Sequence, residues 1–216
     1  MTLAIPGPAG RIEALVDDPV AACTTIAPGT AQPPRAAVVI AHPHPLYGGT
    51  MHTRAVFQAA KAFCRLGCAV LRFNFRGVGL SEGRYSDGDG ERDDFRAALD
   101  FMASRVPGVE IWAAGMSFGA WVAMTVGAAD DRVTTLVGIA VPTLLYDFSP
   151  VGRSPKMKIL VHGERDELCP LRGVWEFYGR AAEPKELVVI DGADHLFDGH
   201  VTEVADALED LLGVSR

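Results

Sequence analysis

Nineteen consecutive residues, 111–129, carry no formal charge. A run of about 18 or more uncharged and mostly apolar residues is long enough to cross a lipid bilayer as a single helix. The same run can instead hold one buried strand followed directly by one buried helix, both covered by other parts of a globular protein. The pattern of the remaining sequence decides between these two interpretations.

Short apolar runs alternate with longer amphipathic runs along most of the chain. Strands are predicted at 36–42, 69–75, 110–116, 133–141, 158–163 and 186–190, and helices at 53–66, 91–105, 118–129, 171–182 and 201–212. This alternation is typical of a mostly parallel sheet with helices on both faces. Uninterrupted apolar runs such as VVIA and LVVI fit strands that are buried on both sides. We therefore predict a single α/β domain over residues 1–216, in which the uncharged run is one strand and one helix.

The first part of the chain is predicted to be a hairpin. Its two strands are RIEALV (11–16) and AACTTI (21–26), separated by a turn at DDP, and a loop follows at 27–35. The segment before them lacks the basic and long apolar parts of a signal peptide, so we expect a cytoplasmic protein.

Charge and cysteine content limit the classes of partner. The chain of 216 residues has a formal net charge of −7 and no run of five or more basic residues. Proteins that bind nucleic acid or anionic membrane surfaces concentrate Lys and Arg, so we expect neither partner here. The cysteines form no C-x-x-C pair and are too few for a disulfide scaffold, so we expect reduced thiols at Cys23, Cys64, Cys68 and Cys169.

The pattern G-x-S-x-G occurs at 115–119, where the predicted strand meets the predicted helix. In a nucleophile elbow, a serine occupies a strained turn at such a junction, and the two glycines let neighbouring backbone segments approach closely. The pattern therefore predicts that Ser117 is a nucleophile presented above the carboxyl end of its strand. The alternative is a structural glycine-rich turn with an idle serine.

A serine hydroxyl needs a histidine base and a carboxylate that orients this histidine. Asp166 follows the predicted strand at 158–163, and His195 follows the last predicted strand. Because parallel strands end at the same edge of a sheet, both residues are expected beside Ser117. We therefore predict a triad of Ser117, His195 and Asp166.

Other carboxylates and histidines compete for these roles. Asp194 adjoins His195 in the sequence, which usually points two side chains apart. Glu164 lies too near the end of its strand, and Asp191 is a further competing carboxylate. His162 is expected to be structural, and His200, at a helix start, to be a surface or capping residue. A metal site made of His42, His44 and His52 is a further alternative. Prolines flank two of these histidines and no acidic ligand lies nearby, so we expect no metal. The predicted serine and histidine chemistry needs no organic cofactor either.

Five segments of the chain carry a family resemblance. They are AHPHPLYGGTM (41–51), LRFNFRGVGLSEG (71–83), GMSFGAW (115–121), HGERDELCP (162–170) and GADHLF (192–197). In this order they resemble the α/β-hydrolase superfamily, and most of all a small bacterial branch without a lid that is related to dienelactone hydrolases. The resemblance covers about residues 36–212 and implies an α/β-hydrolase fold without a cap domain, with the same triad. Dienelactone hydrolases proper use cysteine where this chain has Ser117, so their substrate is not implied.

The resemblance also implies an oxyanion hole made of two backbone N–H groups. The first belongs to Phe118, the residue after the nucleophile. The second belongs to the segment HPHPLYGG, whose prolines have no N–H. His44, Leu46 and Tyr47 are therefore the candidates, and Leu46 is favoured because it precedes the Gly-Gly turn as in the related enzymes.

These residues predict a serine hydrolase that cleaves a small-molecule ester through an acyl-enzyme, as a carboxylesterase does. Thioesterase, dienelactone-hydrolase-like and acyltransferase activities are alternatives on the same triad, as is an inactive hydrolase fold that binds a ligand. Only about sixteen residues separate the strands predicted at 133–141 and 158–163, too few for a helical cap. We therefore expect an open cleft lined by Leu46, Tyr47, Met116, Phe118, Tyr146, Phe148 and Phe197. The protein is expected to be a monomer or a homodimer.

Overall fold

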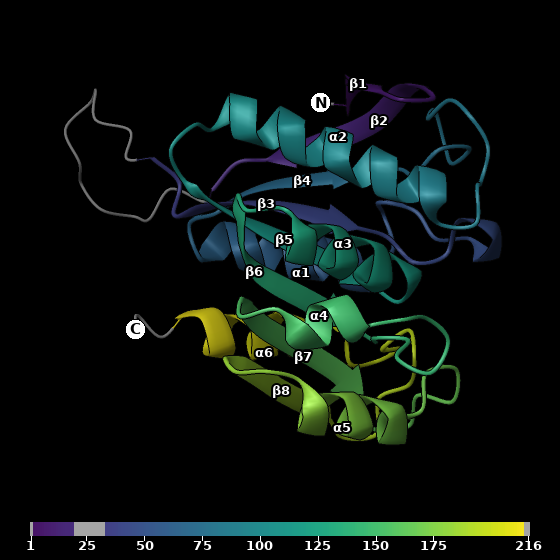
Figure 1. Ribbon diagram of the computed structural model, residues 1–216, viewed down its shortest axis with the longest axis vertical. Helices are drawn as coiled ribbons and strands as arrows, with labels where there is room; N and C mark the ends of the chain where they lie inside the picture. The colour runs from purple at the N-terminus through teal and green to yellow at the C-terminus, as the bar shows by residue number, and fades with distance from the viewer. Residues whose placement is uncertain (1, 20–32, 214–216) are drawn as a thin grey trace.

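An eight-stranded sheet runs through the middle of the molecule (Figure 1). The computed structural model describes residues 2–19 and 33–213. The strands lie in the order β1-β2-β4-β3-β5-β6-β7-β8, and all pairs from β4 to β8 are parallel. Their bounds are β1 (Thr2–Gly7), β2 (Gly10–Asp17), β3 (Ala36–Ala41), β4 (Ala69–Phe73), β5 (Glu110–Met116), β6 (Val133–Ile139), β7 (Met157–Gly163) and β8 (Lys185–Ile190).

Helices cover both faces of this sheet, as Figure 1 shows. One buried cluster joins the sheet to α2 (Asp89–Arg105), α3 (Phe118–Ala129), α4 (Ser149–Arg153) and α5 (Leu171–Arg180). A second cluster joins the opposite face to α1 (Arg54–Arg65) and α6 (Val201–Gly213). A short 3-10 turn, η1 (Pro45–Tyr47), follows β3. This arrangement confirms the α/β prediction and the α/β-hydrolase fold that the resemblance implied.

The uncharged run is one strand and one helix, β5 and α3, with the predicted bounds. β5 is a central strand between β3 and β6, and every residue of it except Glu110 is buried. Among the described residues, none of the helices combines the length and the apolar content of a membrane span. The lack of charge therefore reflects burial from both sides of the sheet.

The prediction for the first hairpin was wrong. β2 pairs with β1, which lies in the Pro- and Gly-rich beginning of the chain, and on its other side with β4. The run 21–26 that was expected to pair with it lies outside the described residues. Other differences are small, since β4 and β6 end two residues early, α2 begins two residues early, and η1 and α4 were not foreseen.

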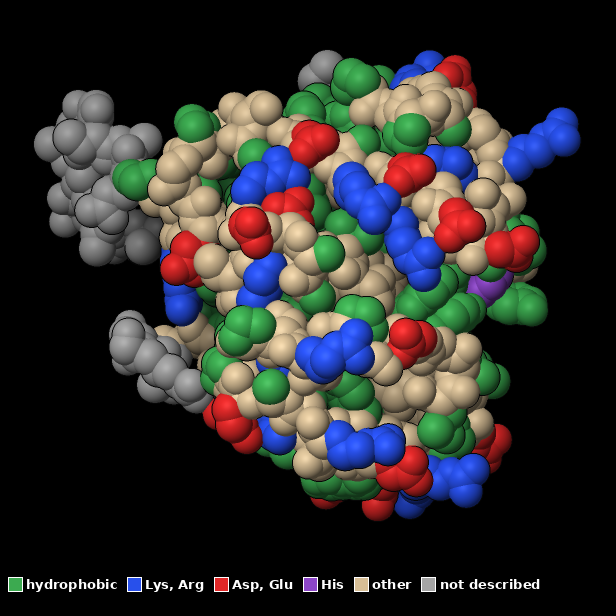
Figure 2. Space-filling model, viewed as in Figure 1, with side chains coloured by type: hydrophobic (Ala, Val, Ile, Leu, Met, Phe, Trp, Pro, Cys, Tyr) green, Lys and Arg blue, Asp and Glu red, His purple; other side chains and the backbone are tan. Residues whose placement is uncertain are grey.

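The outer face made by α2, α4 and α5 carries acidic and basic side chains interspersed with one another (Figure 2). Arg96 pairs with Asp93 within α2, and Arg132 pairs with Asp100 and Asp130 beside it. Exposed pairs of this kind contribute little to stability, so this face is an ordinary solvated surface.

Close packing of α3 on the sheet depends on Gly127. A Cβ atom at this position would lie 2.6 Å from the Cβ of Ala113 in β5 and 2.8 Å from Cδ2 of Leu136 in β6. The Ala113 Cβ is attached directly to the strand backbone and has no rotamer by which to move away. Helix and sheet would therefore have to separate to admit a methyl group.

We expect Gly127→Ala to lower the free energy of unfolding by about 1–3 kcal/mol, the usual cost of overpacking a core. Helix propensity alone predicts the opposite, because Ala is favoured over Gly by about 1 kcal/mol inside a helix. The matched control is Gly179→Ala in α5, where an added Cβ meets nothing within 4 Å and should be neutral or stabilising. Urea denaturation measures both, and equal effects of the two changes would contradict the close packing.

Candidate active site

Ser117 occupies the turn between β5 and α3. Its backbone has φ 54° and ψ −123°, and a positive φ is strained for a residue with a side chain. Its N–H donates to the carbonyl oxygen of Ile139 at 2.8 Å, which ties the turn to the end of β6. The side chain is half-buried and stands at the carboxyl edge of the sheet.

Each of the two glycines in the motif is required for a different steric reason. A Cβ at Gly115 would lie 2.2 Å from the carbonyl oxygen of Gly119, so a side chain there would block the return of the chain into α3. A Cβ at Gly119 would lie 2.3 Å from the carbonyl oxygen of His42, so a side chain there would push α3 away from the segment after β3. The spacing G-x-S-x-G thus brings three backbone segments together around Ser117.

His195 lies between Ser117 and Asp166. Its Nε2 is 2.9 Å from the Ser117 Oγ, and its Nδ1 is 2.7 Å from the Asp166 Oδ2. Because a carboxylate only accepts hydrogen bonds, Nδ1 carries the hydrogen and Nε2 accepts from the serine hydroxyl. This tautomer leaves Nε2 ready to take the serine proton. The structure brings together all three residues that were predicted as the triad.

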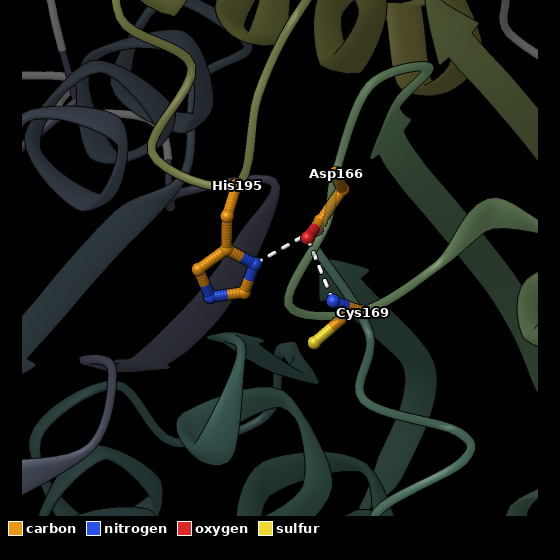
Figure 3. Close-up of side chains that lie close together, drawn as sticks. All are labelled: Asp166, Cys169 and His195. Atoms are coloured by element: carbon orange, nitrogen blue, oxygen red, sulfur yellow. Dashed lines mark hydrogen bonds and ion pairs between the residues drawn. The ribbon is translucent and has the colours of Figure 1, made fainter.

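Asp166 is buried, and both of its carboxylate oxygens are engaged. Oδ1 accepts from the backbone N–H of Cys169 at 2.7 Å, and Oδ2 accepts from His195. Figure 3 shows the carboxylate between these two donors. Cys169 was not predicted to take part in the site, although it lies in the segment HGERDELCP that carries Asp166.

The competing residues have other partners. Glu164 accepts from the N–H of Gly192, and Asp194 accepts from the N–H groups of residues 196 and 198 in its own loop. His200 is paired with Glu203 at the start of α6. Glu164 and Asp194 thus hold the backbone of the loop that carries His195, whereas His200 is tied to α6. The hydrogen-bond partners of the His195 ring are Asp166 and Ser117 instead.

The loop after β3 contains the candidates for the second oxyanion donor. The N–H of Leu46 donates to Nδ1 of His44 at 3.2 Å, and the N–H of Tyr47 donates to the carbonyl oxygen of His44 at 3.1 Å. Within the described parts of the chain, the N–H of His44 has no acceptor. Phe118 opens α3, so its N–H has no acceptor in the helix. This geometry favours His44 as the second oxyanion donor, whereas the family resemblance had favoured Leu46.

The rings of His44 and Phe118 lie side by side, with centroids 4.9 Å apart. The His44 ring accepts from Leu46 at Nδ1, and its Nε2 lies 3.0 Å from the hydroxyl of Tyr85. Both ring nitrogens therefore help to hold the loop after β3 against the start of α3. Tyr85 was not predicted, since nothing in its local sequence places it near this loop.

His42 joins the ends of β3 and β4. Its Nδ1 donates to the carbonyl oxygen of Pro43 at 2.6 Å, and its Nε2 accepts from the N–H of Phe75 at 3.1 Å. Burial lowers the pKa of the ring to about 4, so His42 is neutral. Because both nitrogens are occupied, the ring is not available to a metal together with His44 and His52.

A different group has the spacing of metal ligands. Among the described residues, Asp166, Cys169 and His195 offer atoms that lie within 4.8 Å of one another (Figure 3). Two of these residues, Asp166 and His195, are already hydrogen-bonded to each other within the triad. Burial and the nearby Asp166 raise the pKa of the Cys169 thiol to about 12, so the thiol is protonated and is a poor ligand. The donor set fits the hydrogen-bonded triad better than a metal centre.

The expectation for the cleft was partly wrong. Leu46 and Tyr47 are exposed, and Tyr146 is half-buried. Met116, Phe118 and Phe197 are 0–1% exposed and pack in the two cores, so they offer no surface to a substrate. Phe148 is also buried, but with Tyr146 it borders a cavity of about 390 Å³ between α4 and α5 that includes none of the triad.

Loops at the same edge of the sheet expose apolar side chains that were not predicted. These loops follow β6, β7 and β8, and the side chains are Leu144, Leu145, Leu168 and Leu196, each about half exposed or more. With Leu46 and Tyr47 they give this edge an apolar surface. A leucine in a polar loop is the signal that could have found them.

The fold and the arrangement around Ser117 define the class as an α/β serine hydrolase without a lid. The sequence model of the family described as serine aminopeptidase, S33, matches residues 32–147. An uncharacterized protein of Rickettsia prowazekii is 33% identical over an alignment of 215 residues that covers 95% of this chain and 86% of the other. The chain therefore belongs to this family of α/β hydrolases.

Two solved structures are similar over nearly their whole length. An alpha-beta serine hydrolase homologue from Coxiella burnetii has 34% identity and a TM-score of 0.88, covering 98% of this chain and 97% of the other. A serine hydrolase without a lid from Xanthomonas campestris has 32% identity and a TM-score of 0.86, covering 97% and 92%. These likenesses agree with the branch that the sequence motifs indicated.

We expect the wild-type protein to lose about 3 kcal/mol more stability between pH 6.5 and pH 4 than His42→Gln, at about 1.4 kcal/mol per pKa unit. The folded pKa of His42 lies below its ordinary value of 6.5, so in this range the unfolded chain binds a proton that the folded chain does not. The contribution of the neutral His42 to the free energy of unfolding is therefore fully present above pH 6.5. It is lost as the pH falls from 6.5 toward 4. Urea unfolding across this range measures the difference, and parallel pH curves would contradict it.

Proposed function

We propose that the protein is a serine esterase that hydrolyses small-molecule esters through an acyl-enzyme on Ser117. The observation that carries this proposal is the placement of His195 between the Ser117 hydroxyl and the Asp166 carboxylate, 2.9 Å and 2.7 Å away. That geometry supplies a nucleophile, a base and an orienting acid in the required tautomer.

The residues act in sequence. Ser117 Oγ attacks the ester carbonyl carbon while His195 Nε2 takes the hydroxyl proton. The charged ring is stabilised by Asp166, and the same proton then passes from Nε2 to the departing alkoxide, which leaves as the alcohol. Water attacks the acyl-enzyme by the same route, and its proton returns through His195 to Ser117 as the acid is released.

The negative charge that develops on the carbonyl oxygen needs hydrogen-bond donors where the start of α3 meets the loop after β3. We assign this role to the backbone N–H groups of Phe118 and His44. The N-terminus of α3, a helix of 12 residues, adds a favourable dipole at the same point. Both N–H groups are held in advance, because the Ser117 turn and the His44 ring fix the two segments that carry them.

The substrate is proposed to be a small ester with an apolar part. The chain between β6 and β7 forms only the five-residue helix α4, so this segment builds no cap over the triad. Exposed leucines of the neighbouring loops can contact a short apolar group but cannot surround a long one. Thioester hydrolysis, acyl transfer and peptide-bond cleavage use the same machinery, whereas a ligand-binding protein without activity has no need of it.

We expect Ser117 to be labelled by a fluorophosphonate probe, and p-nitrophenyl butyrate to be hydrolysed faster than p-nitrophenyl laurate. Ser117→Ala should abolish labelling and lower kcat on the order of 10⁶-fold, as removal of the serine does in subtilisin. An aminoacyl p-nitroanilide is the matched amide substrate and should be hydrolysed more slowly. Absence of labelling would favour the inactive binding protein, and faster turnover of the anilide would favour a peptidase.

We expect His44→Pro to have a kcat about 10²–10³-fold below that of His44→Ala, the usual cost of losing one oxyanion donor. Both changes remove the ring, but only proline removes the N–H. The backbone at His44 has φ −53°, which a proline ring accepts. Ester hydrolysis by the two variants measures the difference, and equal rates would return the role to Leu46 or Tyr47.

A further inference from the structure

His162 stands at the end of β7, fully buried beneath the Asp166 turn, and the reaction above does not use it. Its Nε2 lies 2.7 Å from the carbonyl oxygen of Cys169 and 3.5 Å from the Asp166 Oδ2. A carbonyl oxygen only accepts hydrogen bonds, so Nε2 carries the hydrogen. Burial lowers the pKa of the ring, which is therefore neutral and has its lone pair at Nδ1.

That Nδ1 atom has no hydrogen-bond partner among the described residues, and it is the one buried side-chain nitrogen or oxygen in them of which this is true. A buried polar atom without a partner disfavours the folded state. An aromatic side chain of similar size would fill the space without this cost. The hydrogen bond that Nε2 donates therefore explains a histidine at this position better than packing does.

The Nε2–H of His162 donates to the backbone of Cys169, and both the carbonyl oxygen and the N–H of Cys169 are hydrogen-bonded. Its carbonyl oxygen accepts from His162, and its N–H donates to the Asp166 Oδ1 at 2.7 Å. A rotation of this residue would withdraw the N–H from the carboxylate. Loss of that bond would free the carboxylate to turn about its own axis and away from His195.

We propose that His162 is a positioning residue, which fixes Cys169 by its Nε2–H and thereby holds the Asp166 carboxylate in the orientation that His195 requires. This inference rests on the proposed function, since it concerns the same triad. The neutral state of the ring matters, because a charged His162 would compete with His195 for the Asp166 Oδ2. At 3.5 Å the neutral ring leaves that oxygen to His195, whose Nδ1 is 2.7 Å away.

Two kinds of substitution separate positioning from packing. His162→Phe keeps an aromatic ring and removes the donor, whereas the side-chain amide of His162→Gln can place an N–H near the position of Nε2. His162→Asn is a second variant without this donor, because its amide reaches only as far as Nδ1. His200→Gln is the matched control, since it makes the same change at a histidine that pairs with Glu203 away from the triad.

We expect His162→Phe and His162→Asn to lower kcat for p-nitrophenyl butyrate about 10- to 100-fold with KM nearly unchanged. This loss is smaller than the roughly 10⁴-fold loss when the orienting carboxylate of a serine protease is neutralised. His162→Gln should recover most of the rate, and His200→Gln should retain the wild-type rate. Circular dichroism and cooperative unfolding identify the variants that are folded.

A second readout needs no substrate. The proton shared by His195 and Asp166 should give a strongly downfield proton NMR resonance in the wild type and in His162→Gln, weakened or lost in His162→Phe and His162→Asn. Wild-type rates and resonances in the variants without the donor would overturn the inference, as would equal losses in His162→Gln and His162→Phe. A wild type that shows the resonance but no ester hydrolysis would instead contradict the proposed function.

Discussion

Parallel pairing of the strands from β4 to β8 is the constraint on which the site depends. Because these strands point the same way, the loops that follow β5, β7 and β8 meet at one edge of the sheet. This arrangement brings Ser117 and Asp166 within hydrogen-bond distance of His195, although they lie 78 and 29 positions from it in the chain. A change of register in β7 or β8 would separate the acid from the base even with every side chain intact.

Close backbone contacts convert this general placement into usable geometry. The positive φ of Ser117 is maintained by glycines that allow α3 to touch the end of β5 and the segment after β3. His42 and His44 hold that segment by hydrogen bonds from their rings. Site residues on rigid, mutually packed elements keep their orientation before substrate arrives, which is the basis of electrostatic stabilisation in such sites.

Where sequence patterns failed, they failed for identifiable reasons. β1 contains Pro6 and Gly7 and is followed by Pro8, a composition that argues against a strand. However, β1 is the edge of the sheet, where proline is tolerated. Met116 and Phe197 were expected in the cleft, and they lie one residue before Ser117 and two residues after His195. Neighbours in a strand or tight turn point in different directions, and the core beneath α1 and α6 takes both side chains.

Local pattern and chain order were enough to predict the alternation of strands and helices, the elbow at Ser117, and His195 and Asp166 as the residues that join it. The folded arrangement was needed to identify the N–H of the loop after β3 that is free, the leucines that are exposed, and the contact of His162 with the Asp166 turn. These features depend on hydrogen bonds and packing between segments far apart in the chain, such as His44 with Tyr85. A single sequence carries no local signal for contacts of that kind.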